Sequence, residues 1–137
     1  ERPEGTWVLD AGHNPASAAA LADTLDRVSP PAPRVLLAAV LADKDWRSLL
    51  APLRVRTERA VLTVAPSSPG ERRWDPRAAA AELGEGAEAV ADFDEAMARA
   101  RELAGEGTVL VAGSCHTVGD VLRRLDPDPD DPSGADG

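Results

Sequence analysis

The chain of 137 residues contains one cysteine, Cys115, so it cannot form an intrachain disulfide. Aromatic residues make up 3% of it and tyrosine is missing, so leucine, valine and alanine must fill the core. No apolar run approaches the ~18 residues of a membrane span, and no signal peptide is visible. The length suits one domain, and the single cysteine fits the cytoplasm, where thiols stay reduced. The lack of a membrane span argues against a membrane partner.

Two nucleotide-binding motifs are also missing. The sequence has neither GxGxxG nor GxxxxGK[ST], the glycine-rich turns that hold phosphates in dinucleotide-binding and P-loop folds. Its two histidines and one cysteine lack the spacing of metal ligands, so no metal site is expected. If the chain takes part in ATP chemistry, another domain must supply the phosphate cradle.

The charge is uneven along the chain. The net charge is −9, and five of the acids lie in DPDPDDPSGADG at residues 126–137. Residues 1–125 carry 15 basic and 19 acidic side chains, a net charge of −4. We expect 1–125 to form the folded domain and 126–137 to be a disordered acidic tail. The absence of a basic patch argues against a nucleic-acid partner.

Short apolar runs alternate with helical patterns throughout the chain. Strands are expected at 7–9, 35–42, 60–65, 88–90 and 108–113, and helices at 15–28, 43–53, 76–84, 93–103 and 116–125. Such alternation predicts parallel strands joined by right-handed crossovers. The expected fold is α/β: a three-layer, doubly wound, mostly parallel sheet of about five or six strands.

In such a sheet, ligands bind at the carboxyl ends of the strands. Four loops follow strands in this sequence, at 10–15, 42–46, 66–76 and 113–116, and all four contain polar or charged residues. These loops are therefore the candidate binding site.

The first loop reads DAGHNP. Asn14 is a good helix N-cap and Pro15 fits the first helical position, so both residues have a structural role at the start of a helix. Asp10 ends a strand and could accept hydrogen bonds from ribose hydroxyls or an adenine amine. His13, at a helix N-terminus, could donate to a carboxylate or phosphate. The alternative is a turn aspartate and a surface histidine.

The last loop contains Gly113, which allows a sharp turn, and Ser114, which opens a helix whose free N–H groups could bind an anion. Taken by itself, the position of Ser114 favours a role as an N-cap alone. Cys115 precedes His116, but adjacent helical residues do not face each other. We therefore expect Cys115 to be a small buried hydrophobic residue rather than a nucleophile.

The two middle loops carry cations. Lys44 lies between Asp43 and Asp45, either of which could orient it toward a phosphate or carboxylate. Arg72 and Arg73 could clamp similar groups. Solvated surface charges are the alternative for all of them.

Four motifs in this order resemble one enzyme family. They are DAGHNP, Lys44–Asp45 after the second strand, Arg72 within SSPGERRWDP, and GSCHTV after the last strand. The set resembles the carboxyl-terminal domain of bifunctional dihydrofolate synthase/folylpolyglutamate synthase, in the Mur ligase superfamily. The family usually reads D-G-A-H-N-P, so Ala and Gly are exchanged here.

The resemblance implies a ligase that uses ATP and Mg²⁺ to activate a carboxylate of dihydropteroate or a reduced folate as an acyl phosphate. The amine of L-glutamate then attacks to form an amide. The P-loop and metal ligands would lie in an amino-terminal domain absent from this chain, so the chain alone is expected to be an inactive monomer. The implied roles are catalysis for His13 and Ser114, nucleotide binding for Asp10 and Asn14, and substrate binding for Lys44, Asp45, Arg72 and His116.

Three other readings stay open. A cell-wall Mur ligase would perform the same chemistry on a nucleotide-sugar peptide, but its usual D-D-Y-A-H motif is not matched by Asp10 followed by Ala-Gly. A non-catalytic nucleotide- or anion-binding module is the second. A hydrolase using Ser114 with His13 is the third, and it lacks a GxSxG nucleophile elbow.

Overall fold

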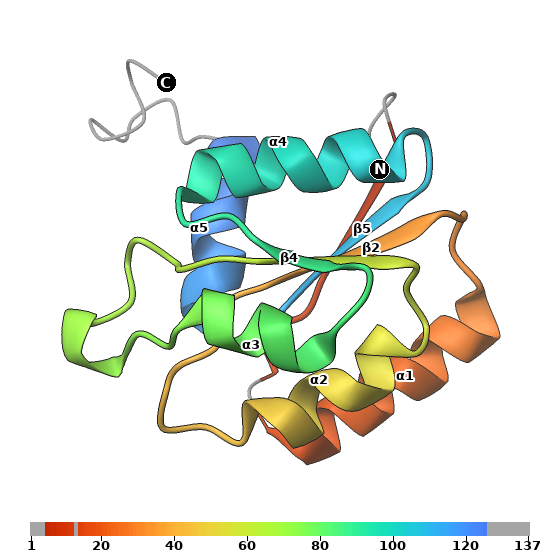
Figure 1. Ribbon diagram of the computed structural model, residues 1–137. Coiled ribbons are helices and arrows are strands. Elements are labelled where there is room, and N and C mark those ends of the chain that lie inside the picture. Colours follow the sequence, from red (N-terminus) through yellow and green to blue (C-terminus); the bar gives the residue numbers. More distant parts are fainter. Residues whose placement is uncertain (1–4, 13, 126–137) are drawn as a thin grey trace.

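Five parallel strands form the centre of the fold, in the spatial order β1-β5-β2-β3-β4 (Figure 1). The computed structural model describes residues 5–12 and 14–125. The strands are β1 (Thr6–Leu9), β2 (Arg34–Ala38), β3 (Arg59–Leu62), β4 (Ala87–Ala89) and β5 (Thr108–Ala112). The expected parallel sheet is confirmed, with the last strand inserted between the first two.

Helices cover both faces of the sheet. They are α1 (Pro15–Val28), α2 (Trp46–Arg54), α3 (Pro76–Leu83), α4 (Phe93–Ala104) and α5 (Cys115–Leu125), with a short 3₁₀ helix η1 (Gly70–Arg72). The helices α1, α2 and α3 lie on one face and α4 and α5 on the other (Figure 1). Side chains of the first three join one apolar cluster, and those of the other two join a second cluster. The sheet therefore separates two cores, which confirms the three-layer, doubly wound α/β fold.

The central strands are apolar along their whole length because both of their faces are covered. In β2, Leu36 faces the α1–α3 core and Leu37 faces the α4–α5 core, and both are fully buried. On α4, Ala96, Ala100 and Ala104 are also fully buried. These small side chains let the helix lie close to the sheet, as the low aromatic content predicts.

The helices begin where the sequence places capping side chains. Asn14 caps α1, and the carboxylates of Asp45, Asp75 and Asp92 cap α2, α3 and α4 by accepting backbone N–H groups of the first turn. Each such cap contributes about 1 kcal/mol. The predicted Asn14 cap with Pro15 as the first helical residue is confirmed.

Two strands end earlier than the apolar pattern predicts. The run expected to be a strand at 35–42 ends its strand at Ala38, and the run at 60–65 ends at Leu62. Val40 and Leu41 stay buried, and Leu41 pairs with Arg73 in an isolated antiparallel bridge. The backbone N–H of Lys44 then donates to the carbonyl of Leu41 at 3.1 Å. This turn delays the start of α2 to Trp46.

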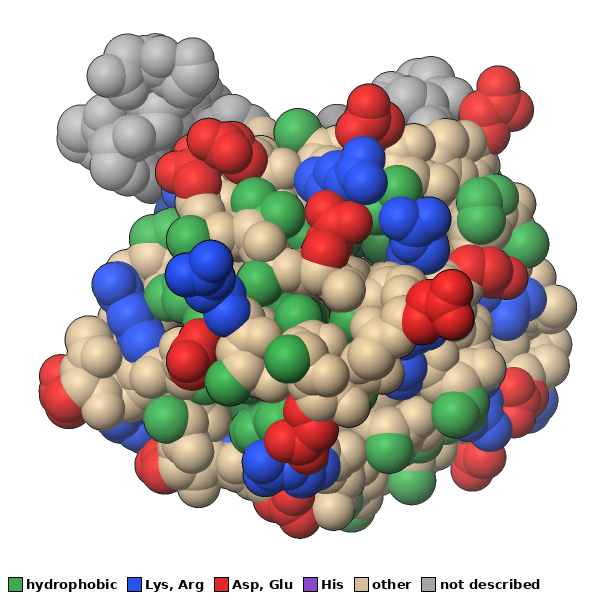
Figure 2. All heavy atoms as spheres, viewed as in Figure 1, with side chains coloured by type: hydrophobic (Ala, Val, Ile, Leu, Met, Phe, Trp, Pro, Cys, Tyr) green, Lys and Arg blue, Asp and Glu red, His purple; other side chains and the backbone are tan. Residues whose placement is uncertain are grey.

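Charged side chains of both signs are interspersed on the face shown in Figure 2, and neither sign gathers into a patch there. Within residues 5–12 and 14–125, no helix has the length and apolar character needed to cross a bilayer.

Candidate functional site

The four polar loops lie at one edge of the sheet. Residues 10–15, 42–46, 66–76 and 113–116 follow β1, β2, β3 and β5, and parallel strands bring their carboxyl ends to the same edge. The strand order makes the loops after β5 and β2 neighbours, and likewise those after β2 and β3. The predicted gathering of these loops is therefore confirmed.

The loops after β2 and β3 are tied together by an ion pair. Arg72 Nη2 lies 2.9 Å from Asp43 Oδ2, and the backbone N–H of Ala42 donates to the carbonyl of Arg72. The hydrogen bond from Arg72 holds the pKa of the Asp43 carboxyl below its ordinary value. Arg72 thus reaches the sheet edge with one side of its guanidinium fixed.

Lys44 lies half-buried beside this pair. Neither neighbouring carboxylate holds it as predicted: Asp43 is paired with Arg72, and Asp45 accepts a hydrogen bond from the backbone N–H of Ser48 at 3.3 Å. Hydrogen bonding with Ser48 also lowers the pKa of Asp45. Among the described residues, the Lys44 ammonium forms no hydrogen bond or ion pair, although its charge helps to lower the pKa of Asp43.

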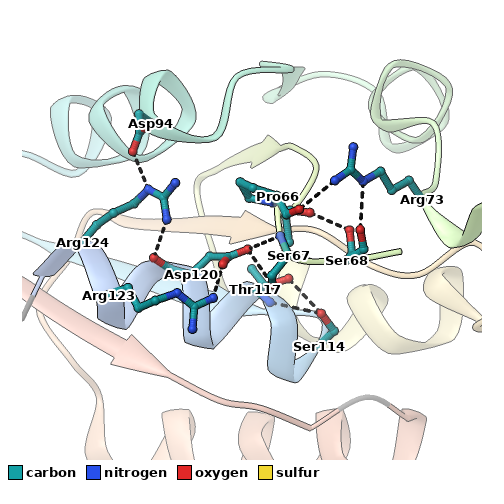
Figure 3. A network of polar contacts seen from close by, with 11 residues as sticks. Pro66, Ser67, Ser68, Arg73, Asp94, Ser114, Thr117, Asp120, Arg123 and Arg124 are labelled. Atoms are coloured by element: carbon teal, nitrogen blue, oxygen red, sulfur yellow. Dashed lines mark hydrogen bonds and ion pairs between the residues drawn. The ribbon is translucent and has the colours of Figure 1, made fainter. Parts of the chain in front are cut away.

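The Arg73 side chain stabilises the loop in which it lies. Its Nε donates to the carbonyl of Ser68 at 3.2 Å and its Nη2 donates to the carbonyl of Pro66 at 2.7 Å (Figure 3). The indole Nε1 of the next residue, Trp74, donates to the carbonyl of Thr63 at 2.7 Å in the core. Of the two arginines proposed as clamps, Arg73 thus binds two carbonyls of its own loop, whereas Arg72 binds a carboxylate of the loop after β2.

The turn from β5 into α5 requires its glycine. Gly113 has φ = 126°, and a Cβ there would lie 2.4 Å from the carbonyl oxygen of Ala39. Ser114 is 3% exposed, and its Oγ accepts the backbone N–H of Thr117 at 3.2 Å. Thr117 Oγ1 in turn donates to the Ala39 carbonyl at 2.7 Å. Ser114 therefore caps the first turn of α5, and its contact with a substrate stays a prediction.

The expectation that Cys115 is buried is wrong. Its side chain is exposed, because the buried stripe of α5 runs through Thr117, Asp120 and Val121 and Cys115 lies off that stripe. His116 lies in the same first turn and is partly exposed. Cys115 and His116 thus stand at the sheet edge, where the thiol has no packing role.

The loop after β1 keeps its predicted form where it is described. The backbone N–H of Asp10 donates to the carbonyl of Val111 at 3.0 Å, and Asp10 is half-buried. Asn14 Oδ1 accepts the N–H of Ser17 at 2.9 Å. A Cβ at Gly12 would lie 2.4 Å from Ser17 Cβ, so glycine is needed at this position. His13 lies outside the described residues, and its role stays a prediction.

A narrow crevice with no room for a water molecule lies at the carboxyl ends of β2 and β3. Its lining is mostly apolar, with Ser68, Arg73 and Ser114 as the polar members. Loop 66–76 and the Ser114 turn therefore border the same space.

A buried acid links the same two segments, and sequence reasoning missed it. Asp120 is 2% exposed, and its Oδ2 accepts both the backbone N–H and the hydroxyl of Ser67 at 3.0 Å (Figure 3). Arg123 contacts the other carboxylate oxygen. The available signal was the helical spacing of Thr117, Asp120 and Val121, which places an acid on the buried stripe.

The described residues do not fit a resident metal ion. No group of three or more histidine, cysteine, aspartate or glutamate side chains in residues 5–12 and 14–125 is arranged to bind one. A nucleoside needs a hydrogen-bond acceptor for its hydroxyls and amine, and the half-buried Asp10 carboxylate at the end of β1 is of that type.

The sheet and its polar edge match those of a known domain family. The family model described as Mur ligase, glutamate ligase domain, matches residues 1–115, and the chain belongs to this family. The resemblance found in the four motifs is thereby confirmed. A comparison with curated proteins finds no match.

Solved structures similar to this chain include folate enzymes of the family. The Mycobacterium tuberculosis folylpolyglutamate synthase complexed with ADP and AMPPCP is 30% identical, with a TM-score of 0.76 over 88% of this chain. E. coli FolC in complex with DHPP and ADP is 30% identical, with a TM-score of 0.72 over 88%. A bifunctional folylpolyglutamate synthase/dihydrofolate synthase with Mn, AMPPNP and L-glutamate bound is 28% identical, with a TM-score of 0.68 over 85%. This chain spans only 28–29% of the length of those three chains.

Proposed function

We propose that this chain is the glutamate-binding domain of an ATP-dependent ligase that adds L-glutamate to dihydropteroate or to reduced folates. Its membership of the glutamate ligase domain family supports the reaction class. The ligands named for its structural relatives, which are ADP, DHPP and L-glutamate, support the choice of substrates.

The proposed ligase is longer than this chain. The relatives have about three times its length, and the described residues contain neither a metal-binding group nor a glycine-rich phosphate loop. We therefore assign the ATP phosphates and Mg²⁺ to the remaining part of the protein. ATP supplies the phosphoryl group that converts the acceptor carboxylate into an acyl phosphate. The present domain closes over that site and excludes the water that would hydrolyse it.

The observation that carries the proposal is the position of Arg72 and Lys44 at one sheet edge. L-Glutamate has two carboxylates, and a guanidinium with a lysine ammonium in the neighbouring loop suits both of them. Asp43 binds one side of the Arg72 guanidinium at 2.9 Å, which fixes its direction while its remaining N–H donors stay available. We place Asp45 and His116 at the border of this glutamate site.

The other roles follow the sequence motifs. We propose that Asp10 and Asn14 contact the nucleoside and that His13 and Ser114 lie near the reacting carboxylate. A histidine that donates to the developing negative charge would stabilise the tetrahedral intermediate of amide formation. Ser114 would act through the free N–H groups of the first α5 turn, since its own hydroxyl is engaged with Thr117.

The test is phosphate release by the protein that joins this chain to its remaining domain. The assay contains Mg-ATP and dihydropteroate or a reduced folate, with and without L-glutamate, and is repeated with His13→Ala. We expect release that depends on both L-glutamate and the pterin compound and falls by about 100-fold or more in the variant. Asp23→Ala, an exposed α1 residue, is the control.

Two outcomes would overturn the proposal. Release that ignores L-glutamate would remove the ligase reaction. Release that needs a nucleotide-sugar peptide instead of any pterin compound would move the protein to the cell-wall branch of the family.

A further inference from the structure

We propose that Asp120 is a positioning residue of the ligase site, because its buried carboxylate fixes loop 66–76 against α5 and thereby sets the place of Arg72. The inference rests on the proposed function for its kinetic consequence. The contact itself stands on the structure alone.

The contact between Asp120 and Ser67 goes beyond what packing α5 on the sheet requires. Asp120 is 2% exposed on α5, and burying a carboxylate is costly unless it is hydrogen-bonded. Ser67, 53 residues earlier, meets this need with its backbone N–H and its hydroxyl, both at 3.0 Å from Oδ2. Bonds to an ionised acceptor are stronger than neutral ones, so Ser67 is firmly attached to α5.

The charge of Asp120 is balanced from its own helix. Arg123 contacts Oδ1, and Arg124 donates to the Asp120 carbonyl at 3.0 Å while it also contacts Asp94 of α4 (Figure 3). Among the described residues, neither arginine forms a hydrogen bond or ion pair with loop 66–76. The acid is therefore held from the helix side and directs one oxygen toward the loop.

A displacement of Ser67 would be transmitted through loop 66–76 to Arg72. Arg73 binds the carbonyls of Pro66 and Ser68, the two neighbours of Ser67, at 2.7 and 3.2 Å. Arg72 is the residue directly before Arg73 and lies in η1. Because the two ends of the loop are fastened to each other, Ser67 and Arg72 shift together.

Other links also tie the loops of this edge. Thr117 Oγ1 donates to the Ala39 carbonyl at 2.7 Å and joins α5 to the segment after β2. Arg72 pairs with Asp43 at 2.9 Å and joins the loop after β2 to the loop after β3. These links connect α5 to the loop after β3 by way of the segment after β2.

The bond between Asp120 and Ser67 closes this chain of links into a ring, so that the segments after β2, β3 and β5 support one another. The ring holds the Arg72 guanidinium at a fixed place relative to the α5 N-terminus, as pre-organised binding of glutamate requires.

The kinetic test uses the protein that joins this chain to its remaining domain. Asp120→Leu removes the acceptor, Asp120→Asn keeps one acceptor oxygen, and Ser67→Ala keeps the backbone donor. Asp94→Ala is the matched control, because it alters the same arginine network on the side away from the loop. We expect Asp120→Leu to raise the KM for L-glutamate about tenfold or more, with smaller rises for the other two variants. The KM for ATP stays unchanged.

The second readout does not need activity. Hydrogen exchange at the Ser67 amide should accelerate about tenfold or more in Asp120→Leu, while amides within β5 keep their protection. In Asp94→Ala, the exchange at Ser67 should not change. If Asp120→Leu does not fold, Asp120→Asn and Ser67→Ala carry both readouts.

The outcomes separate the two proposals. Unchanged Ser67 exchange in a folded variant would show that the carboxylate does not hold the loop. Faster exchange with an unchanged KM for L-glutamate would show that holding the loop does not position the site; either result overturns the inference. A wild-type protein without glutamate-dependent turnover instead overturns the proposed function.

Discussion

Arg72 and Asp43, 29 residues apart in the chain, meet at 2.9 Å and join the loops that follow two neighbouring strands. The pair does more than neutralise two surface charges. It fixes an arginine at the edge where α/β sheets bind ligands, next to Lys44. Only β2 lies between β3, which precedes Arg72, and β5, which leads into the Ser114 turn.

The pH dependence of this pair can be predicted in sign. The hydrogen bond from Arg72 places the folded-state pKa of Asp43 below the ordinary value of 3.8. The pair therefore stabilises the folded state above that value, and the contribution disappears as the pH falls through the lowered pKa. In Arg72→Met, a carboxyl titration by NMR should show the pKa of Asp43 rising toward 3.8.

Asp26 is the internal control for this titration, because Arg56 lowers its pKa in the same way on a different part of the surface. Its midpoint should not move in Arg72→Met. An Asp43 midpoint equal in both proteins would show that the pair does not form in solution.

Gly12 tests the exchanged Ala-Gly order of the first motif. A Cβ at this position would lie 2.4 Å from Ser17 Cβ and 3.0 Å from Asp10 Oδ2. We expect Gly12→Ala to lower the free energy of unfolding by about 1–3 kcal/mol, since α1 must shift. Urea unfolding measures it. In a Ser17→Gly background the cost of Gly12→Ala should be smaller, and an undiminished cost would rule out this clash as its cause.

Asn14 separates a capping role from a nucleotide contact. Asn14→Ala removes the acceptor for the Ser17 N–H and should lower the free energy of unfolding by about 1 kcal/mol. Asn14→Ser keeps a capping hydroxyl and should be nearly neutral. If the amide also contacts the nucleoside, both variants bind ADP more weakly in the longer protein. ADP affinity that follows stability alone would limit Asn14 to capping.

The 137-residue chain by itself should release no phosphate from Mg-ATP above background. The physical reason is that its described residues contain no arrangement to hold a metal ion, so the triphosphate cannot be oriented for transfer. Measured turnover that persists after a second, independent purification would show that the catalytic machinery is complete within this chain.

The sequence predicted the elements whose signals are local. The capping role of Asn14 follows from its residue type and its place directly before Pro15, and the burial of β2 follows from its unbroken apolar run. The end of β2 could not be predicted from the sequence, because Val40 and Leu41 are as apolar as the strand itself. What ends the strand is the departure of the chain toward Arg73, a partner that no local pattern specifies.

The site divides in the same way. The four loops and the candidate cation Arg72 could be read from strand ends and motifs. The partner of Arg72 could not, since Lys44 beside Asp43 offered an equally plausible pairing by charge alone. The bond of Asp120 to Ser67 spans 53 residues, and its existence depends on how α5 packs on the sheet. Cys115 was misjudged because residue type predicts burial less well than position on the helix stripe.

Incorporation of labelled L-glutamate tests the central claim most directly. The protein that contains this chain is incubated with Mg-ATP, labelled L-glutamate and either dihydropteroate or a reduced folate, and the pterin products are separated and counted. The account predicts one amide-linked glutamate for each phosphate released, with incorporation lost in His13→Ala and the KM for glutamate raised in Arg72→Met. Phosphate release without label in any pterin product would contradict it.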